Sequence, residues 1–134
     1  MNDIIKENKF DCIIPVLNVK NIAESLKYYQ HVLGFKKDWD WGEPVSFASV
    51  SRDGVAIFLC EDAQGQSGMW MSIFINNVDD LYEEYKASGA KVLQPPTNFP
   101  WGMREMNVED LDGHRFRMGS DTTEPSAGIP LHES

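Results

Sequence analysis

The feature that most constrains the fold of this chain is an internal repeat. Two turns carry the same pair of residues, Asp53-Gly54 in the first half and Asp112-Gly113 in the second. Asp and Gly readily supply the backbone conformations that a tight two-strand connection needs. Each turn is flanked by two extended runs, so each half is expected to end in a β-hairpin. Self-similarity at a fixed spacing predicts a duplicated structural unit.

The beginnings of the two halves repeat as well. Each has a strand, then an Asn that can cap the free N–H groups of a helix, then a helix, and then a Gly suited to the left-handed position after it. Strand, cap, helix and glycine are expected at 12–19, Asn21, 22–33 and Gly34, and again at 69–75, Asn77, 78–88 and Gly89.

Three further strands are expected in each half, so the pattern predicts an α+β fold. Two βαβββ modules would form a curved mixed sheet around a cleft, within one domain that spans residues 1–134. Module 1 covers about 10–61 and module 2 about 68–119, with a polar C-terminal tail at 120–134. The further strands are expected at 35–42, 45–51 and 55–61, and at 91–94, 103–108 and 114–119, with a proline-rich exposed loop at 95–100.

The charge and the apolar runs of the sequence limit the kinds of partner that the protein can bind. Lys plus Arg number 12 and Asp plus Glu 21, a net charge of −9, which argues against nucleic acid because phosphates require a basic surface. The charge is compatible with a cationic partner, or it serves solubility alone. No apolar run approaches 18 residues and no signal-peptide region opens the chain, so we expect a cytoplasmic protein without a membrane span. Cys12 and Cys60 fall in expected strands and are predicted to be buried thiols.

Four segments, in this order, resemble the glyoxalase, bleomycin-resistance and extradiol-dioxygenase superfamily, which has the vicinal oxygen chelate fold. They span about residues 10–119 and read IIPVLNVKNIAESLKYYQHVLGF, RDGVAIFLCED, INNVDDLYEEY and PWGMREMNVEDLDGHRFRMG. The IPVL opening, the VDDLYEEY helix and the PWG-x-RE hairpin are most similar to the bleomycin resistance proteins.

The resemblance implies four positions where catalytic relatives hold a divalent cation with His or Glu. This chain has Ile14, Phe58, Trp70 and Arg117 there. None is a carboxylate or imidazole, and the fixed positive charge of Arg repels a metal. We therefore expect no metal or other cofactor and favour a protein that is not an enzyme. A metal-dependent glyoxalase-type lyase or isomerase acting on a small oxygenated substrate remains the alternative.

Aromatic side chains are expected to line the cleft in place of metal ligands, where they can stack on planar rings or hold cations. Trp101 follows Pro100 in a turn, and in the resemblance it matches a cleft position. Phe47 and Phe58 could instead be ordinary sheet core, and Trp70 is open between the two roles. The candidate ligand-binding residues are Trp101, Trp70, Phe58, Phe47, Trp41, Trp39, Ser49 and Arg117.

The resemblance to the bleomycin resistance proteins implies a homodimer with two clefts across its subunit interface. Each cleft would sequester a planar, cationic, glycopeptide-like antibiotic without modifying it. Besides the enzyme alternative, a third hypothesis is a fold retained for a structural or regulatory partner.

Overall fold

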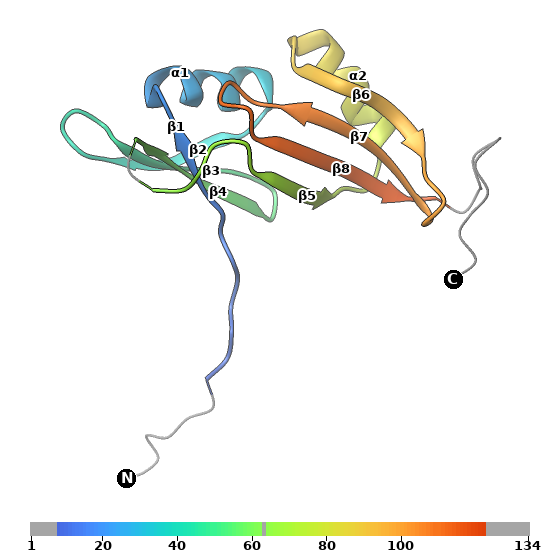
Figure 1. Ribbon diagram of the computed structural model, residues 1–134, viewed down its shortest axis with the longest axis horizontal. Helices are drawn as coiled ribbons and strands as arrows, with labels where there is room; N and C mark the ends of the chain where they lie inside the picture. The colour runs from blue at the N-terminus through green and yellow to red at the C-terminus, as the bar shows by residue number, and fades with distance from the viewer. Residues whose placement is uncertain (1–7, 63, 123–134) are drawn as a thin grey trace.

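The computed structural model describes residues 8–62 and 64–122, which form two modules lying side by side (Figure 1). The first module contains β1 (Val16–Val19), α1 (Ile22–Lys27), η1 (Tyr28–Val32), β2 (Lys36–Trp41), β3 (Phe47–Arg52) and β4 (Val55–Glu61). The second contains β5 (Trp70–Phe74), α2 (Val78–Ser88), β6 (Lys91–Asn98), β7 (Met103–Glu109) and β8 (Arg115–Asp121).

The two modules have the same sheet topology. One four-stranded sheet has the order β1-β4-β3-β2 and the other β5-β8-β7-β6. In each, the first strand is parallel to the last and the remaining pairs are antiparallel. Val16 lies opposite Phe58, and Ser72 opposite Arg117. Ser72 lies 72 − 16 = 56 residues after Val16, and Arg117 lies 117 − 58 = 59 residues after Phe58. These are the same offsets that separate Asn21 from Asn77 and Asp53 from Asp112 in the sequence repeat. The predicted α+β fold of two βαβββ modules is confirmed.

Local signals place the helices as predicted. The side chain of Asn21 accepts the backbone N–H of Glu24 at 3.0 Å, and that of Asn77 accepts the N–H of Asp80 at 3.1 Å. α2 ends at Gly89, whose φ of 87° is the left-handed conformation that glycine adopts without a steric cost. The first helix continues past α1 as the single π-helical turn η1 before the chain reverses.

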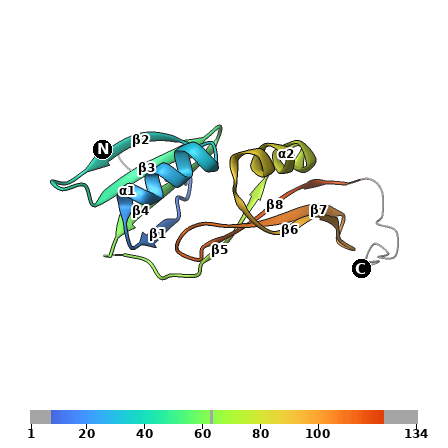
Figure 2. The same cartoon turned by 90° about the horizontal axis from the view of Figure 1, so that it is seen from above.

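Both helices lie on the same side of the paired sheets (Figures 1 and 2). Alternation along each strand sends one set of side chains beneath the helices and the other set to the opposite face. Tyr29 and Tyr85, 1% exposed, reach the core from η1 and α2. The core beneath the helices also contains Leu17, Val19, Val50, Ile57, Leu59, Met106, Val108, Phe116 and Met118. We call the opposite side the open face.

The second module's hairpin turn docks on the first module through polar contacts. The imidazole of His114, 0% exposed, accepts the Met69 N–H at Nδ1 (3.1 Å), so its proton sits on Nε2, which donates to the Asn18 carbonyl (2.8 Å). The hydroxyl of Tyr29 donates to Asp110 at 2.7 Å. The His114–Asn18 and Tyr29–Asp110 bonds cross between the modules, so buried polar groups fix how the two sheets meet.

Some boundaries differ from those predicted. The first strand begins at Val16 instead of residue 12, because Pro15 cannot donate to the ladder and the residues before it pair with no described strand. Cys12 is therefore exposed, whereas Cys60 is buried as predicted. The predicted loop at 95–100 is in part strand, since β6 runs to Asn98. β6 is an edge strand with a register shift between Gln94 and Thr97, a place where prolines are tolerated.

The ends of the chain are described only in part. β8 continues through Asp121, beyond the expected start of the C-terminal tail, and the rest of that tail, residues 123–134, lies outside the described residues. Residues 1–7 lie outside them too. Residues 8–15 extend from β1 away from both sheets (Figure 1), with Phe10 and Ile13 fully or nearly fully exposed. None of the described helices has the length and apolar character that crossing a membrane requires.

Candidate ligand-binding site

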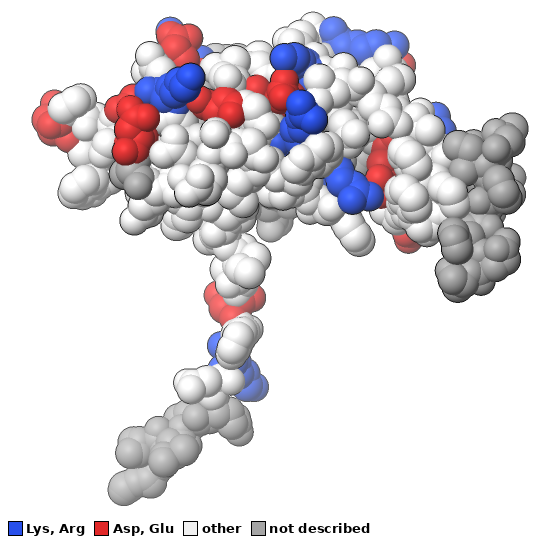
Figure 3. All heavy atoms as spheres, viewed as in Figure 1, with Lys and Arg blue, Asp and Glu red and all other residues white. Residues whose placement is uncertain are grey.

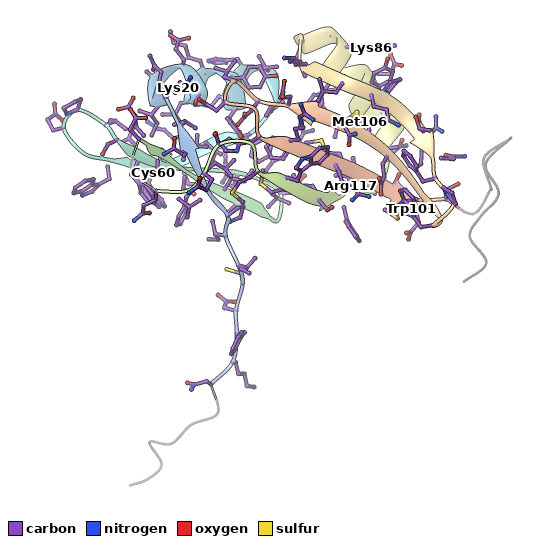
Figure 4. The ribbon with its side chains drawn as sticks, in the orientation of Figure 1. Lys20, Cys60, Lys86, Trp101, Met106 and Arg117 are labelled. Atoms are coloured by element: carbon purple, nitrogen blue, oxygen red, sulfur yellow. The ribbon has the colours of Figure 1, made fainter. Side chains whose placement is uncertain are left out.

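A cavity of about 510 Å³ lies on the open face of the second sheet. Trp101 reaches it from the turn between β6 and β7, and Arg117 from β8; Figure 4 labels both. The cavity is lined by Trp70, Met71, Ser72, Gln94, Phe99, Trp101, Glu105, Asn107 and Arg117. The volume suits a small ring system, and the mixture of aromatic walls with a few polar groups is typical of small-molecule sites.

A buried carboxylate organises the polar part of the cavity. Glu105 is 9% exposed, and its Oε2 accepts the indole N–H of Trp101 at 3.1 Å. The guanidinium of Arg117 donates through Nη2 to both carboxylate oxygens, at 3.1 and 3.4 Å. Glu105 therefore fixes the position of one aromatic wall and of the cation beside it. It was missed among the predicted site residues, although its place four residues after Trp101 in the PWG-x-RE motif is visible in the sequence.

Arg104, the residue before Glu105, points the other way because successive strand residues alternate. Its guanidinium binds Asp79 at the start of α2, at 2.9 Å. Arg104 and Glu105 thus have separate partners. Arg104 ties the sheet to the helix, and Glu105 serves the cavity.

The aromatic walls are already in contact with neighbouring groups. The rings of Phe99 and Trp101 stack at 4.7 Å with an interplanar angle of 7°. The guanidinium of Arg117 lies 6.0 Å from the Trp101 ring, and that of Arg115 lies 5.4 Å from the Trp70 ring. The sequence predicts that aromatic side chains of the cleft, Trp101 among them, stack on planar rings or hold ligand cations, and it leaves Trp70 open between core and ligand contact. In the structure the protein's own arginines lie over these two rings.

Arg115 belongs to a charged group beside the cavity. Glu109 accepts from Lys91 Nζ at 2.7 Å and from Arg115 Nε at 3.2 Å. The hydrogen bond from Lys91, and after it that from Arg115, lowers the pKa of the Glu109 carboxyl below its ordinary value.

Figure 3 shows Asp and Glu side chains gathered toward the β2 end of the first module and Lys and Arg side chains over the second.

The first sheet carries a separate aromatic cluster on its open face. Trp39, Phe47 and Phe58 contact one another with ring centroids 5.2–5.6 Å apart. Phe47 and Phe58 are partly exposed there and do not belong to the core beneath α1. Trp41, at the end of β2, is 69% exposed.

Ser49 lies on the same face but is only 3% exposed, and its hydroxyl donates to Asp38 at 3.1 Å. The structure thus brings together Trp70, Trp101 and Arg117 in one cavity. It places the other predicted site residues, Trp39, Trp41, Phe47, Ser49 and Phe58, on the other sheet, and none of them lines this cavity.

The positions that hold a metal in catalytic relatives do not fit one here. Ile14 precedes β1, and Phe58, Trp70 and Arg117 carry no metal-ligating oxygen, nitrogen or sulfur of the usual kind. Across residues 8–62 and 64–122, no three His, Cys, Asp or Glu side chains come together in a way that could hold a metal ion. Of the histidines, His31 lies on η1 and His114 is used at the module junction.

The chain thus has paired βαβββ modules with the helices on one side and an aromatic cavity on the other. The chain belongs to the Glyoxalase/Bleomycin resistance protein/Dioxygenase superfamily, whose profile matches residues 11–118. Curated protein sequences give no match.

Solved structures share the fold at low sequence identity. TioX from Micromonospora sp. ML1 has a TM-score of 0.73 at 20% identity, covering 83% of this chain and 99% of that one. The bleomycin-binding protein from Streptomyces verticillus, solved with copper(II)-bleomycin, has a TM-score of 0.69 at 22% identity, covering 88% and 100%. A superfamily member from Sphaerobacter thermophilus DSM 20745 has 0.71 at 22%, covering 84% and 98%.

Proposed function

We propose that this protein is a metal-independent binding protein that sequesters a planar, antibiotic-like small molecule without modifying it. The observation that carries the proposal is the cavity beside Glu105. Its walls are aromatic, and its buried Glu105 is hydrogen-bonded to Trp101 and Arg117. The positions that the resemblance assigns to metal ligands hold residues that do not bind metal. The copper(II)-bleomycin complex of the Streptomyces verticillus protein shows that this fold can hold such a molecule.

We propose further that the working form is a homodimer in which the first sheet of one copy covers the cavity of the other. Trp39 and Trp41 are 41% and 69% exposed on an open sheet face, and Trp70 and Trp101 are 52% and 54% exposed on the other. Exposed aromatic surface of this kind marks interaction sites. A second copy would place the Trp39 cluster opposite the cavity, so that all the predicted aromatic residues would line one cleft.

The cationic part of such a ligand would then contact the first sheet. Arginines already lie over Trp70 and Trp101, whereas no Lys or Arg of the described residues lies over the rings of Trp39, Phe47 and Phe58. The net charge of −9 favours the approach of a cation to the protein as a whole.

Titration of tryptophan fluorescence with metal-free bleomycin and with copper(II)-bleomycin tests the proposal. We expect saturable binding, recovery of unmodified drug and a drug-to-chain ratio of one. Drug that returns chemically altered would refute sequestration, and no binding of either form would refute a bleomycin-type ligand. A stoichiometric divalent metal in purified protein, detected by elemental analysis, would favour the glyoxalase-type enzyme instead.

Resistance and location belong to the same proposal. Cells that express the chain are expected to tolerate more bleomycin than cells that express a Trp70→Ala, Trp101→Ala double variant at equal abundance. Cys12 and Cys60 are both free thiols, which is consistent with the reducing cytoplasm. Cell fractionation would test the cytoplasmic location.

A further inference from the structure

The cavity on the second sheet is built to receive an acidic group. We infer that the planar ring system bound there carries a carboxylate, and that this carboxylate is held by the guanidinium of Arg117. The inference rests on the proposed function and adds to it the charge of the ligand on this side of the cleft.

Arg117 has hydrogen-bond donors that are free to bind a ligand. Within the described part of the chain its hydrogen bonds go only to Glu105, and both use the single nitrogen Nη2. Its side chain is 41% exposed and lines the cavity. A guanidinium offers five N–H groups and Glu105 accepts only from Nη2, so the N–H groups of Nε and Nη1 remain to donate to a ligand carboxylate.

Glu105 does not offer a matching site for a cation. Within residues 8–62 and 64–122, it is the one acidic side chain that lines this cavity. It is 9% exposed, and both its oxygens already accept hydrogen bonds, from Trp101 and Arg117. Glu109 beside the cavity is likewise paired with Lys91 and Arg115. Glu105 therefore acts as a positioning residue, which holds the guanidinium of Arg117 at the cavity.

The aromatic walls lead to the same conclusion. A ligand cation at the Trp70 or Trp101 ring would meet Arg115 or Arg117, which lie 5.4 and 6.0 Å from those rings. Like charges at such distances repel and would have to be desolvated together. A planar ring that bears a carboxylate instead stacks on the aromatic wall and neutralises the guanidinium beside it. The positive charge of these arginines thus attracts a ligand carboxylate and repels a ligand cation.

Three probes with the same ring separate charge from stacking: 2-naphthoate, 2-naphthamide and 2-naphthylmethylamine. Isothermal titration calorimetry on the full chain at pH 7.5 gives the affinity for each. We expect naphthoate to bind roughly tenfold more tightly than the amide, as a charge-assisted hydrogen bond implies, and the amine to bind most weakly. An amide or amine that binds as tightly as naphthoate would overturn the inference while leaving ring binding intact.

Arg117→Gln tests the residue itself, and Arg115→Gln is its matched control. Arg115 lies on the same strand and face, contacts a tryptophan ring and a glutamate in the same way, but does not line the cavity. We expect Arg117→Gln to reduce the affinity for naphthoate to that for the amide, and Arg115→Gln to keep the preference for naphthoate over the amide. Equal losses in the two variants, or an equal loss for all three probes in Arg117→Gln, would contradict a specific contact.

Since Arg117→Gln leaves the buried Glu105 unpaired, the Glu105→Gln, Arg117→Gln double variant removes both charges. It is expected to fold, as monitored by its melting curve, and still to lose the preference for naphthoate over the amide. A double variant that keeps this preference would overturn the inference. If none of the three probes binds the wild-type chain up to millimolar concentration, the proposed ring-binding function fails together with the inference.

Discussion

Replacing Tyr29 with Phe removes a single hydroxyl from the junction between the modules. That hydroxyl is buried and donates to Asp110 Oδ2 at 2.7 Å. A hydrogen bond to a charged group contributes about 1.5–3 kcal/mol to stability. For a chain of this length 1 kcal/mol shifts the melting temperature by about 4 °C. We therefore expect Tyr29→Phe to lower the melting temperature at pH 7 by roughly 6–12 °C.

The repeat supplies a matched control. Tyr85, 56 residues later, is equally buried, and its hydroxyl donates to the carbonyl of Leu33 at 2.8 Å. That acceptor is neutral, so losing the bond costs about 0.5–1.5 kcal/mol, or roughly 2–6 °C. Thermal melting followed by circular dichroism compares the two variants with the unsubstituted chain. The larger loss should belong to Tyr29→Phe.

The pH dependence separates the two bonds further. Burial raises the pKa of Asp110 above its ordinary value, and the Tyr29 hydrogen bond opposes that rise. Because the folded chain holds this proton more tightly than the unfolded chain, protonation of Asp110 favours folding as the pH falls. Tyr29→Phe raises the pKa of Asp110 further, so the cost of the substitution is full at pH 7 and shrinks as Asp110 is protonated toward about pH 4.

The cost of Tyr85→Phe should not change over this range, since its acceptor is a backbone carbonyl. Equal costs for the two variants at every pH would refute the assignment of Asp110 as an ionised acceptor at the junction. A larger cost for Tyr29→Phe in acid than at neutral pH would refute the sign of the pKa argument.

Three further outcomes are expected. His114→Ala strands the Met69 N–H and the Asn18 carbonyl, so chemical denaturation should show a loss of about 3–5 kcal/mol, and a loss below 1 kcal/mol would contradict the bridge. Trp101→Ala removes the stack on Phe99 and the hydrogen bond to the Glu105 carboxylate, so the same assay should show a loss of about 1–2 kcal/mol. Naphthoate binding should weaken by a similar amount, and unchanged binding would show that Trp101 does not contact the ligand. Light scattering should give about twice the chain mass of 15.2 kDa, and a monomer at micromolar concentration would contradict the dimer.

The duplicated fold was predictable from the sequence alone. Asn21 and Asn77 cap their helices, and the bounds of α2 and β4 are those predicted. These signals are local, because a cap or a turn is decided by residues within one turn of a helix or hairpin. Residues 95–98 were misassigned since proline looks like a loop former until its strand is known to lie at a sheet edge.

The arrangement of the site, in contrast, depends on tertiary contacts. The sequence showed that this chain is rich in tryptophan, but not that Trp70 and Trp101 share a cavity while Trp39 and Trp41 lie on the other sheet. Nor could it show that Glu105 binds Trp101 and Arg117, because these residues come from the β6–β7 turn and two different strands. Contacts of this kind depend on sheet register and on which face each strand residue takes, and a one-residue shift would reverse them.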